Sequence, residues 1–209
     1  MFDAYLKAFM VLFVVVDPVS MAPVFMALTH GADAAYRKRM AVKGTLIAGG
    51  ILFFFLLIGD VLLGVLGVSL GAFRIAGGLL MFLLALDMVF PKTLGVRSPN
   101  QVERIEAEHR QDISVFPLAF PLLAGPGALT TLMLMLPAQD RGDPVHYAFV
   151  ATVILGVLLI TLASLLLSVR ITAWMGETGA NLLSRLLGLV LAALSVQFVL
   201  DGLRSVLVG

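Results

Sequence analysis

The sequence predicts an all-α polytopic membrane protein with six transmembrane helices, built as a 3+3 inverted repeat with broken first and fourth helices. Composition is the first observation: of 209 residues, 60% are hydrophobic and 13% are charged, whereas about a quarter of a soluble domain is charged. The second is six apolar stretches, each near the ~20 residues that a spanning helix needs. The third is a cluster of prolines near the centre of the first and the fourth stretch.

The polar segments between the apolar stretches set the boundaries. The predicted spans are 2–28, 45–66, 70–90, 115–136, 146–169 and 182–208. The longest polar stretch, 91–114, is interpreted as a cytoplasmic linker between a first three-helix repeat, 1–90, and a second, 115–209. Asp3 precedes Lys7 and no cleavage pattern ends the first apolar run, so we expect a retained span rather than a signal peptide.

Lysine and arginine are unevenly distributed over the predicted loops. One side would carry Arg37, Lys38, Arg39, Lys43, Lys92, Arg97, Arg104, Arg110 and Arg170, and the other Lys7, Arg141 and Arg204. Since cytoplasmic loops carry the excess of basic residues, the first side is predicted to be cytoplasmic. Both termini would then lie on the outer face, and the two halves would be inserted in opposite directions.

The first span is interrupted near its middle by Asp17, Pro18 and Pro23. An ionisable group at that depth costs several kcal/mol unless it meets a partner or water, and each proline removes a backbone donor. Asp followed by Pro is also a common helix start, with Asp as N-cap and Pro at N1. The sequence therefore predicts a helix that stops near Val16 and restarts at Pro18.

Only Gly67, Val68 and Ser69 separate the second span from the third, which predicts a tight hairpin. Asp60 and Arg74 each lie seven residues from Gly67, so they should sit at similar depth. We expect a structural ion pair between them, which is favoured over a role in transport.

The fourth span contains Pro117, Pro121 and Pro126, and glycines flank the last of these. Gly125-Pro126-Gly127 permits a break and a restart, followed by the hydroxyls of Thr130 and Thr131. The five-residue spacing between Pro121 and Pro126 repeats that between Pro18 and Pro23. Arg74 and Gly77 likewise match Arg185 and Gly188 in the last span, in the order that an internal duplication requires. Gln197 could bond across helices or touch a solute.

Two interruptions in corresponding spans of inverted halves indicate the binding site of a secondary transporter. Backbone groups released at a break cannot face lipid, so they line a cavity or meet protein. Free N–H groups at a helix start suit an anion, and free carbonyls at a helix end suit a cation. A zwitterionic amino acid offers both charges. The competing interpretation is a pair of kinked helices without a site.

Eleven residues around the two breaks are therefore predicted to bind substrate. They are Asp17, Pro18, Val19, Ser20, Pro23, Gly125, Pro126, Gly127, Ala128, Thr130 and Thr131. N–H groups near Val19, Ser20 and Ala128 would hold a carboxylate. Asp17 would hold the ammonium, carry a coupling proton, or do both, and the two threonines would add hydroxyls.

Several function classes are disfavoured. The chain has no cysteine, which excludes thiolate metal sites and disulfides, and its net charge of +1 comes without a basic patch for nucleic acid. It contains neither HExxH nor GxSxG, and Ser20 has no deep histidine or lysine to activate it. We expect no enzyme activity, no cofactor and no metal.

Four stretches carry a family resemblance: VDPVSMAPVF, FRIAGGLLMFLLALDMV, FPLAFPLLAGPGALTT and LGLVLAALSVQFVLDGL. They resemble the MarC family of six-span bacterial and archaeal membrane proteins, which includes SnatA-like neutral amino acid transporters. Ser20 and Met21 stand where many members have Gly-Asn. The resemblance implies a multi-pass protein of the cell (inner) membrane that transports glycine, alanine or serine, coupled to protons or sodium. The alternatives are export of another small or drug-like solute and a non-transporting membrane subunit. An oligomer is possible.

Overall fold

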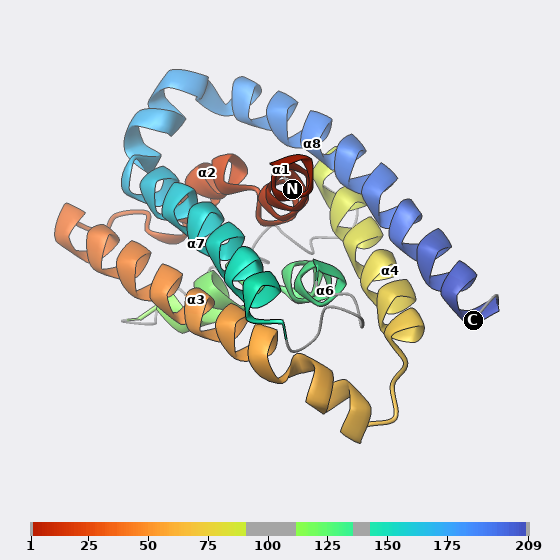
Figure 1. Cartoon of the computed structure of the whole chain (residues 1–209). Coiled ribbons are helices and arrows are strands. Elements are labelled where there is room, and N and C mark those ends of the chain that lie inside the picture. The colour runs from red at the N-terminus through yellow and green to blue at the C-terminus, as the bar shows by residue number, and fades with distance from the viewer. Residues whose placement is uncertain (1, 91–111, 136–142, 208–209) are drawn as a thin grey trace.

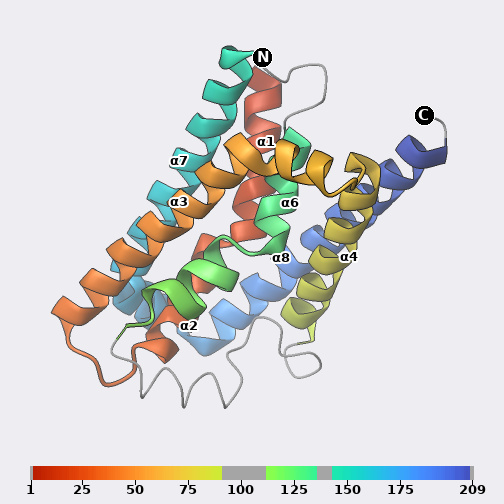
Figure 2. The same cartoon turned by 90° about the horizontal axis from the view of Figure 1, so that it is seen from below.

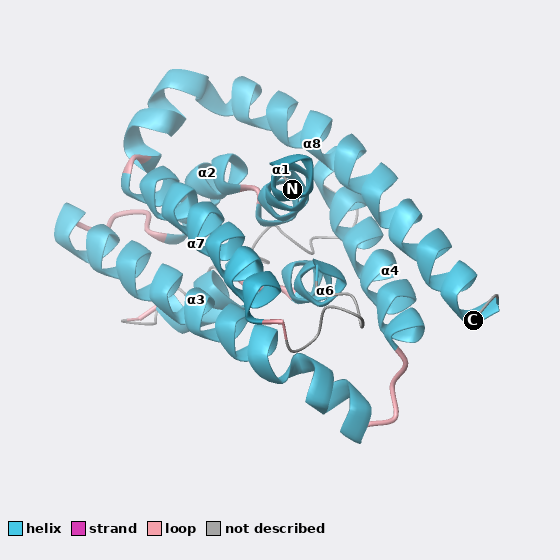
Figure 3. Cartoon of the chain, in the orientation of Figure 1, coloured by secondary structure: helices cyan, strands magenta, loops and turns pink. Residues whose placement is uncertain are grey.

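The computed structural model describes residues 2–90, 112–135 and 143–207, and all regular structure within them is helical (Figure 3). The elements are α1 (Phe2–Val16), α2 (Pro18–Leu28), α3 (Ala34–Val65), α4 (Leu70–Val89), η1 (Ser114–Leu123), α6 (Pro126–Met135), α7 (Pro144–Leu166) and α8 (Ser168–Leu207). The all-α prediction is confirmed. Most of the predicted linker, 91–111, lies outside the described residues.

Five stretches are long and apolar enough to cross a membrane, and a sixth is obtained if η1 and α6 count as one bent span. The five are Tyr5–Leu28, Ala34–Val65, Leu70–Val89, Pro144–Leu166 and Asn181–Leu207. The predicted number of spans therefore agrees with the structure. The inverted symmetry of the two halves stays a prediction.

Two helix boundaries differ from the prediction for local reasons. α3 starts well before residue 45, because the Asp33 carboxylate caps it by accepting the Tyr36 N–H at 2.6 Å. At the other end, the expected connection 170–181 is helical: α8 begins at Ser168 and is interrupted only at Gly176, with φ 62° and ψ 176°. Glycine adopts this positive φ without the steric cost that a side chain would add.

Short half-helices occupy the centre of the bundle. In Figure 1, α1 and α6 are seen nearly end-on, with α3 and α7 on one side and α4 and α8 on the other. Large side chains from different spans fill the core between them, including Leu12, Phe25, Met81, Leu123 and Ile154. The outer helices instead present leucines to the surroundings. The bundle is thus apolar inside and out, as lipid requires.

The tight hairpin predicted for the second and third spans is wrong. The turn at Gly67 is tight, but α4 diverges from α3 and packs along α8 (Figure 2). Glycines allow this approach: a Cβ on Gly78 would lie 2.8 Å from the Ser195 carbonyl oxygen, and a Cβ on Gly202 would lie 2.9 Å from that of Gly71. Close backbone packing between small residues stabilises helix pairs in membranes, and here it joins the two halves of the chain.

Candidate functional site

The first break lies where the sequence predicts it. α1 ends at Val16 and α2 begins at Pro18, while Asp17 between them has φ 51° and ψ 64°. Asp and Asn are the side-chain-bearing residues that tolerate this left-handed conformation best. The Asp17 carboxylate caps α2 by accepting the Ser20 N–H at 3.3 Å, and the residue is completely buried. The sequence has therefore placed a carboxyl group inside the membrane-spanning bundle.

The second break separates η1 from α6 with a bend of 51°. Gly125 is required there, because a Cβ would lie 2.2 Å from the Pro121 carbonyl oxygen. The Gly125 carbonyl already accepts the Leu129 N–H at 3.1 Å. Since Pro126 has no N–H, the first two amide donors of α6 belong to Gly127 and Ala128. A Gly-Pro-Gly sequence thus creates a helix start in the middle of a span, as predicted.

The two breaks meet. α1 and α6 lie side by side and run in opposite directions (Figures 1 and 2). A Cβ on Gly127 would lie 3.3 Å from Val15 Cγ1, which places the start of α6 against the end of α1. The negative end of one helix dipole and the positive end of another therefore lie close together, an arrangement that suits a ligand with both charges.

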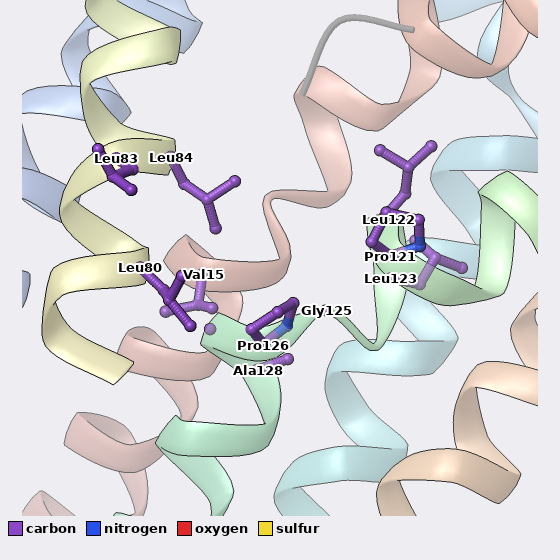
Figure 4. A pocket seen from close by; sticks show the side chains of 11 residues that line it. Val15, Leu80, Leu83, Leu84, Pro121, Leu122, Leu123, Gly125, Pro126 and Ala128 are labelled. Carbon is purple, nitrogen blue, oxygen red and sulfur yellow. The ribbon is translucent and has the colours of Figure 1, made fainter. Parts of the chain in front are cut away.

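A cavity of about 170 Å³ opens at this junction (Figure 4). Its walls come from α1, α4, η1 and α6: they are Val15, Leu80, Leu83, Leu84, Pro121, Leu122, Leu123, Gly125, Pro126, Gly127 and Ala128. The lining is mostly apolar: leucine side chains of α4 lie on one side, and the end of η1 and the start of α6 lie on the other. For scale, an apolar protein cavity of about 150 Å³ holds a benzene molecule.

The cavity collects only part of the predicted site. Gly125, Pro126, Gly127 and Ala128 line it, whereas Asp17, Pro18, Val19, Ser20 and Pro23 do not. The first span reaches the cavity through Val15 instead. The Ser20 N–H, predicted to hold a carboxylate, already donates to Asp17. The Ser20 hydroxyl is buried and has no hydrogen-bond partner among the described residues.

The two predicted threonines lie at the contact between α6 and α4. Thr130 packs on Gly77, where a Cβ would come within 1.9 Å of the threonine Cγ2. The Thr131 hydroxyl donates to Met81 Sδ at 3.9 Å. Neither residue lines the cavity; in this conformation both side chains contact α4.

Three further polar residues singled out by the sequence do not line the cavity. The ion pair between Asp60 and Arg74 stays a prediction. Arg74 lines a shallow groove with Gly71 and Ser205, because Gly71, one turn earlier on α4, packs against α8. Gln197 donates to Asp201 at 2.8 Å on the exposed side of α8.

A polar cluster at the start of η1 was missed by sequence reasoning. Asp112 forms an ion pair with Lys43 of α3 and accepts the Ser114 N–H at 2.9 Å and its hydroxyl at 2.5 Å. The hydrogen bond from Lys43, helped by the two from Ser114, lowers the Asp112 pKa from 3.8 to about 2. This cluster ties the entrance of the fourth span to α3. The described residues hold no group of three or more potential metal-ligating side chains.

The leucines of the cavity wall were also missed. Leu80, Leu83 and Leu84 are apolar residues within an apolar span, and nothing in their identity separates cavity-facing from lipid-facing positions. The one usable signal is the adjacent Gly77, which lets α4 approach α6 closely. Residues one turn after such a contact are candidates for the same interior face.

Comparison with known proteins gives a consistent assignment. A profile described as MarC family integral membrane protein matches residues 2–207. The chain is 34% identical to the UPF0056 membrane protein YhcE of Escherichia coli, over 100% of this chain and 95% of that protein. It is 35% identical to YvbG of Bacillus subtilis, over 98% and 96%, and 37% identical to MJ1677 of Methanocaldococcus jannaschii, over 97% of each. No solved structure matches.

Proposed function

The chain belongs to the MarC family of integral membrane proteins, and from this premise we propose that it is a secondary transporter of small neutral amino acids. The substrates would be of the glycine, alanine and serine class, and their movement across the cell membrane would be coupled to protons or sodium. The observation that carries this proposal is the meeting of two broken spans at one cavity. Transporter sites typically lie where interrupted helices converge at mid-depth.

The chemistry of the junction supports a zwitterionic solute. The first amide groups of α6, on Gly127 and Ala128, would donate to the carboxylate, helped by the positive end of that helix. The negative end of the α1 dipole, beside Val15 and Val16, would attract the ammonium. Glycine at position 127 permits close approach to the backbone. A neutral side chain would then extend toward α4.

Asp17 is the candidate coupling residue. It is buried two residues from Val15, and its carboxylate caps α2. It would either stabilise the ammonium of the substrate or take up a coupling proton. A change in the charge of Asp17 would change the free energy of burying this side chain in the bundle. This would favour one conformation of the broken span over another.

Uptake into proteoliposomes tests the proposal. We expect the purified protein to accumulate radiolabelled glycine, alanine or serine when a proton or sodium gradient is imposed. Asp17→Asn should abolish this accumulation, because asparagine tolerates the same backbone conformation and caps helices as well as aspartate, so that mainly the charge is lost. If Asp17 carries the proton, exchange of labelled for unlabelled alanine should survive. If it holds the ammonium, exchange should fail too.

Two outcomes would contradict these assignments. A correctly inserted wild-type protein that moves none of the three amino acids under either gradient would refute amino acid transport. Unchanged accumulation by Asp17→Asn would remove Asp17 from the mechanism and leave the transport proposal intact.

The leucine wall favours a second candidate, export of a small apolar or drug-like solute. Ligands that bind only the folded state raise its apparent stability, so a thermal-shift screen of amino acids and hydrophobic compounds separates the two candidates. Stabilisation by amino acids supports the first, and stabilisation only by apolar compounds supports the second. A non-transporting subunit would respond to neither.

A further inference from the structure

We infer that α4 sets the side-chain selectivity of the site, with Leu84 as the residue that limits substrate size. The site would favour alanine over serine and would reject branched aliphatic amino acids. This inference rests on the proposed function and adds to it a specificity determinant and a ranking of substrates.

Three of the five leucines that line the cavity come from α4 and form what we call the leucine wall. Leu80, Leu83 and Leu84 follow one another at spacings of three and four residues on α4, so their side chains share a helix face. Figure 4 shows them on the α4 side of the cavity, with Pro126 and Ala128 across from them. A solute in between would contact the start of α6 on one side and only apolar side chains of α4 on the other.

Leu84 is the innermost of the three. Its Cδ1 lies 3.6 Å from the position that a Cβ on Gly127 would take, so it is within contact distance of the start of α6. Leu80 and Leu83 are 44% and 42% exposed and form the outer edge of the wall. With the carboxylate on the α6 amides, the substrate side chain would therefore meet Leu84.

The small volume of the cavity favours small side chains. About 170 Å³ is close to the size of the cavity that accommodates benzene, and alanine is comparable to benzene in size. Each carbon that valine or leucine adds to alanine would bring the substrate side chain closer to Leu84, so we expect both to be disfavoured unless the wall moves. The serine hydroxyl would lose its hydrogen bonds to water at the leucine wall, which offers no acceptor. Binding of serine would therefore be disfavoured. Hydrophobic pockets discriminate a single methylene by roughly 10- to 200-fold.

Substitutions at position 84 in opposite directions test the inference. In the Leu84→Ala variant, unlabelled valine should compete better with labelled alanine: its half-inhibitory concentration should fall by about tenfold or more. The preference for alanine over serine should also become smaller. Leu84→Phe should fill the cavity and shift the preference toward glycine. Leu79→Ala, on the same helix at a position 54% exposed and outside the cavity lining, should leave the wild-type ranking unchanged.

The outcomes separate this inference from the proposed function. If the wild-type protein transports alanine and both variants at position 84 keep the wild-type ranking, Leu84 does not set selectivity. If the wild-type protein transports no amino acid, the proposed function itself fails. Should either variant lose uptake, thermal-shift titration with alanine, valine and glycine measures the same ranking from binding alone. Leu80→Ala, at the edge of the wall, should shift that ranking in the direction of Leu84→Ala but less.

Discussion

At the scale of single residues, Asp17 combines a left-handed backbone conformation with a buried carboxyl group. This combination is unusual, because a positive φ is unfavourable for most residues with a side chain and an acidic residue is costly in the bilayer interior. Asparagine would satisfy the backbone alone. The proposed coupling role requires a carboxyl group here, whereas the geometry of the break would be served equally well by asparagine.

Asp112 supplies a prediction about pH. A carboxyl group whose pKa is lower in the folded protein stabilises the fold above its unfolded pKa, here 3.8, and this contribution is lost as pH falls toward the folded value of about 2. The side chains of Lys43 and Asp112 are 50% and 41% exposed, so the contribution is at most ~1 kcal/mol.

The measurement is thermal unfolding in detergent at several pH values. Asp112→Asn should unfold at a slightly lower temperature than the wild type at pH 7 and at the same temperature near pH 2, and added salt should shrink the difference at pH 7. A difference that stays constant between the two pH values would contradict the assigned ion pair.

The two helix breaks could be predicted from the local sequence. The breaks at Asp17-Pro18 and Gly125-Pro126 follow from the backbone chemistry of the residues themselves, and they were located from the sequence alone. The sequence could not predict which way the side chains of Thr130 and Thr131 point. The rotation of α6 about its axis is set by the bend at Gly125 and by contact with Gly77. That contact joins residues far apart in the chain.

At the scale of elements, α4 and α6 make a close contact near the site. Gly77→Ala would place a methyl group 1.9 Å from Thr130 Cγ2, so the two helices must separate or Thr130 must move. We expect a loss of about 1–3 kcal/mol in stability, typical of an overpacked core. The measurement is the apparent unfolding temperature in detergent.

Gly50→Ala is the matched control for that substitution. A Cβ at Gly50 meets nothing within 4 Å, and alanine is favoured over glycine in a helix by up to about 1 kcal/mol. The control should therefore be neutral or slightly stabilising. Equal destabilisation by both substitutions would show that the α4–α6 contact is not as close as described.

The pairing of elements shows where sequence reasoning ends. A four-residue connection between α3 and α4 indicates a hairpin, yet α4 packs on α8 because glycines on both helices allow close approach. Helices in a membrane gain little from hydrophobic burial against one another, so close packing at small residues decides which helices pair. Proximity along the chain does not decide it. The glycines could be identified from the sequence, but the residues on the other helix against which they pack could not.

At the scale of the whole molecule, the fold brings together the middles of two spans that are about a hundred residues apart in the chain. α1 begins and α8 ends on the same side of the bundle (Figure 2), as an even number of spans requires. Composition and span length were enough to predict this architecture. Convergence of the breaks was a hypothesis until the contact between Val15 and Gly127 supported it.

Protection of a single thiol probes this junction most directly. The chain has no cysteine, so Ala128→Cys places one thiol on the cavity wall, and Val68→Cys places one in the exposed α3–α4 turn as a control. Alanine at ten times its Kd should slow alkylation of the cavity thiol by about tenfold, because occupied sites are shielded, and should leave the control unchanged. Alkylation of the cavity thiol at one rate with and without alanine, glycine or serine would mean that the meeting point of the two breaks does not bind these solutes.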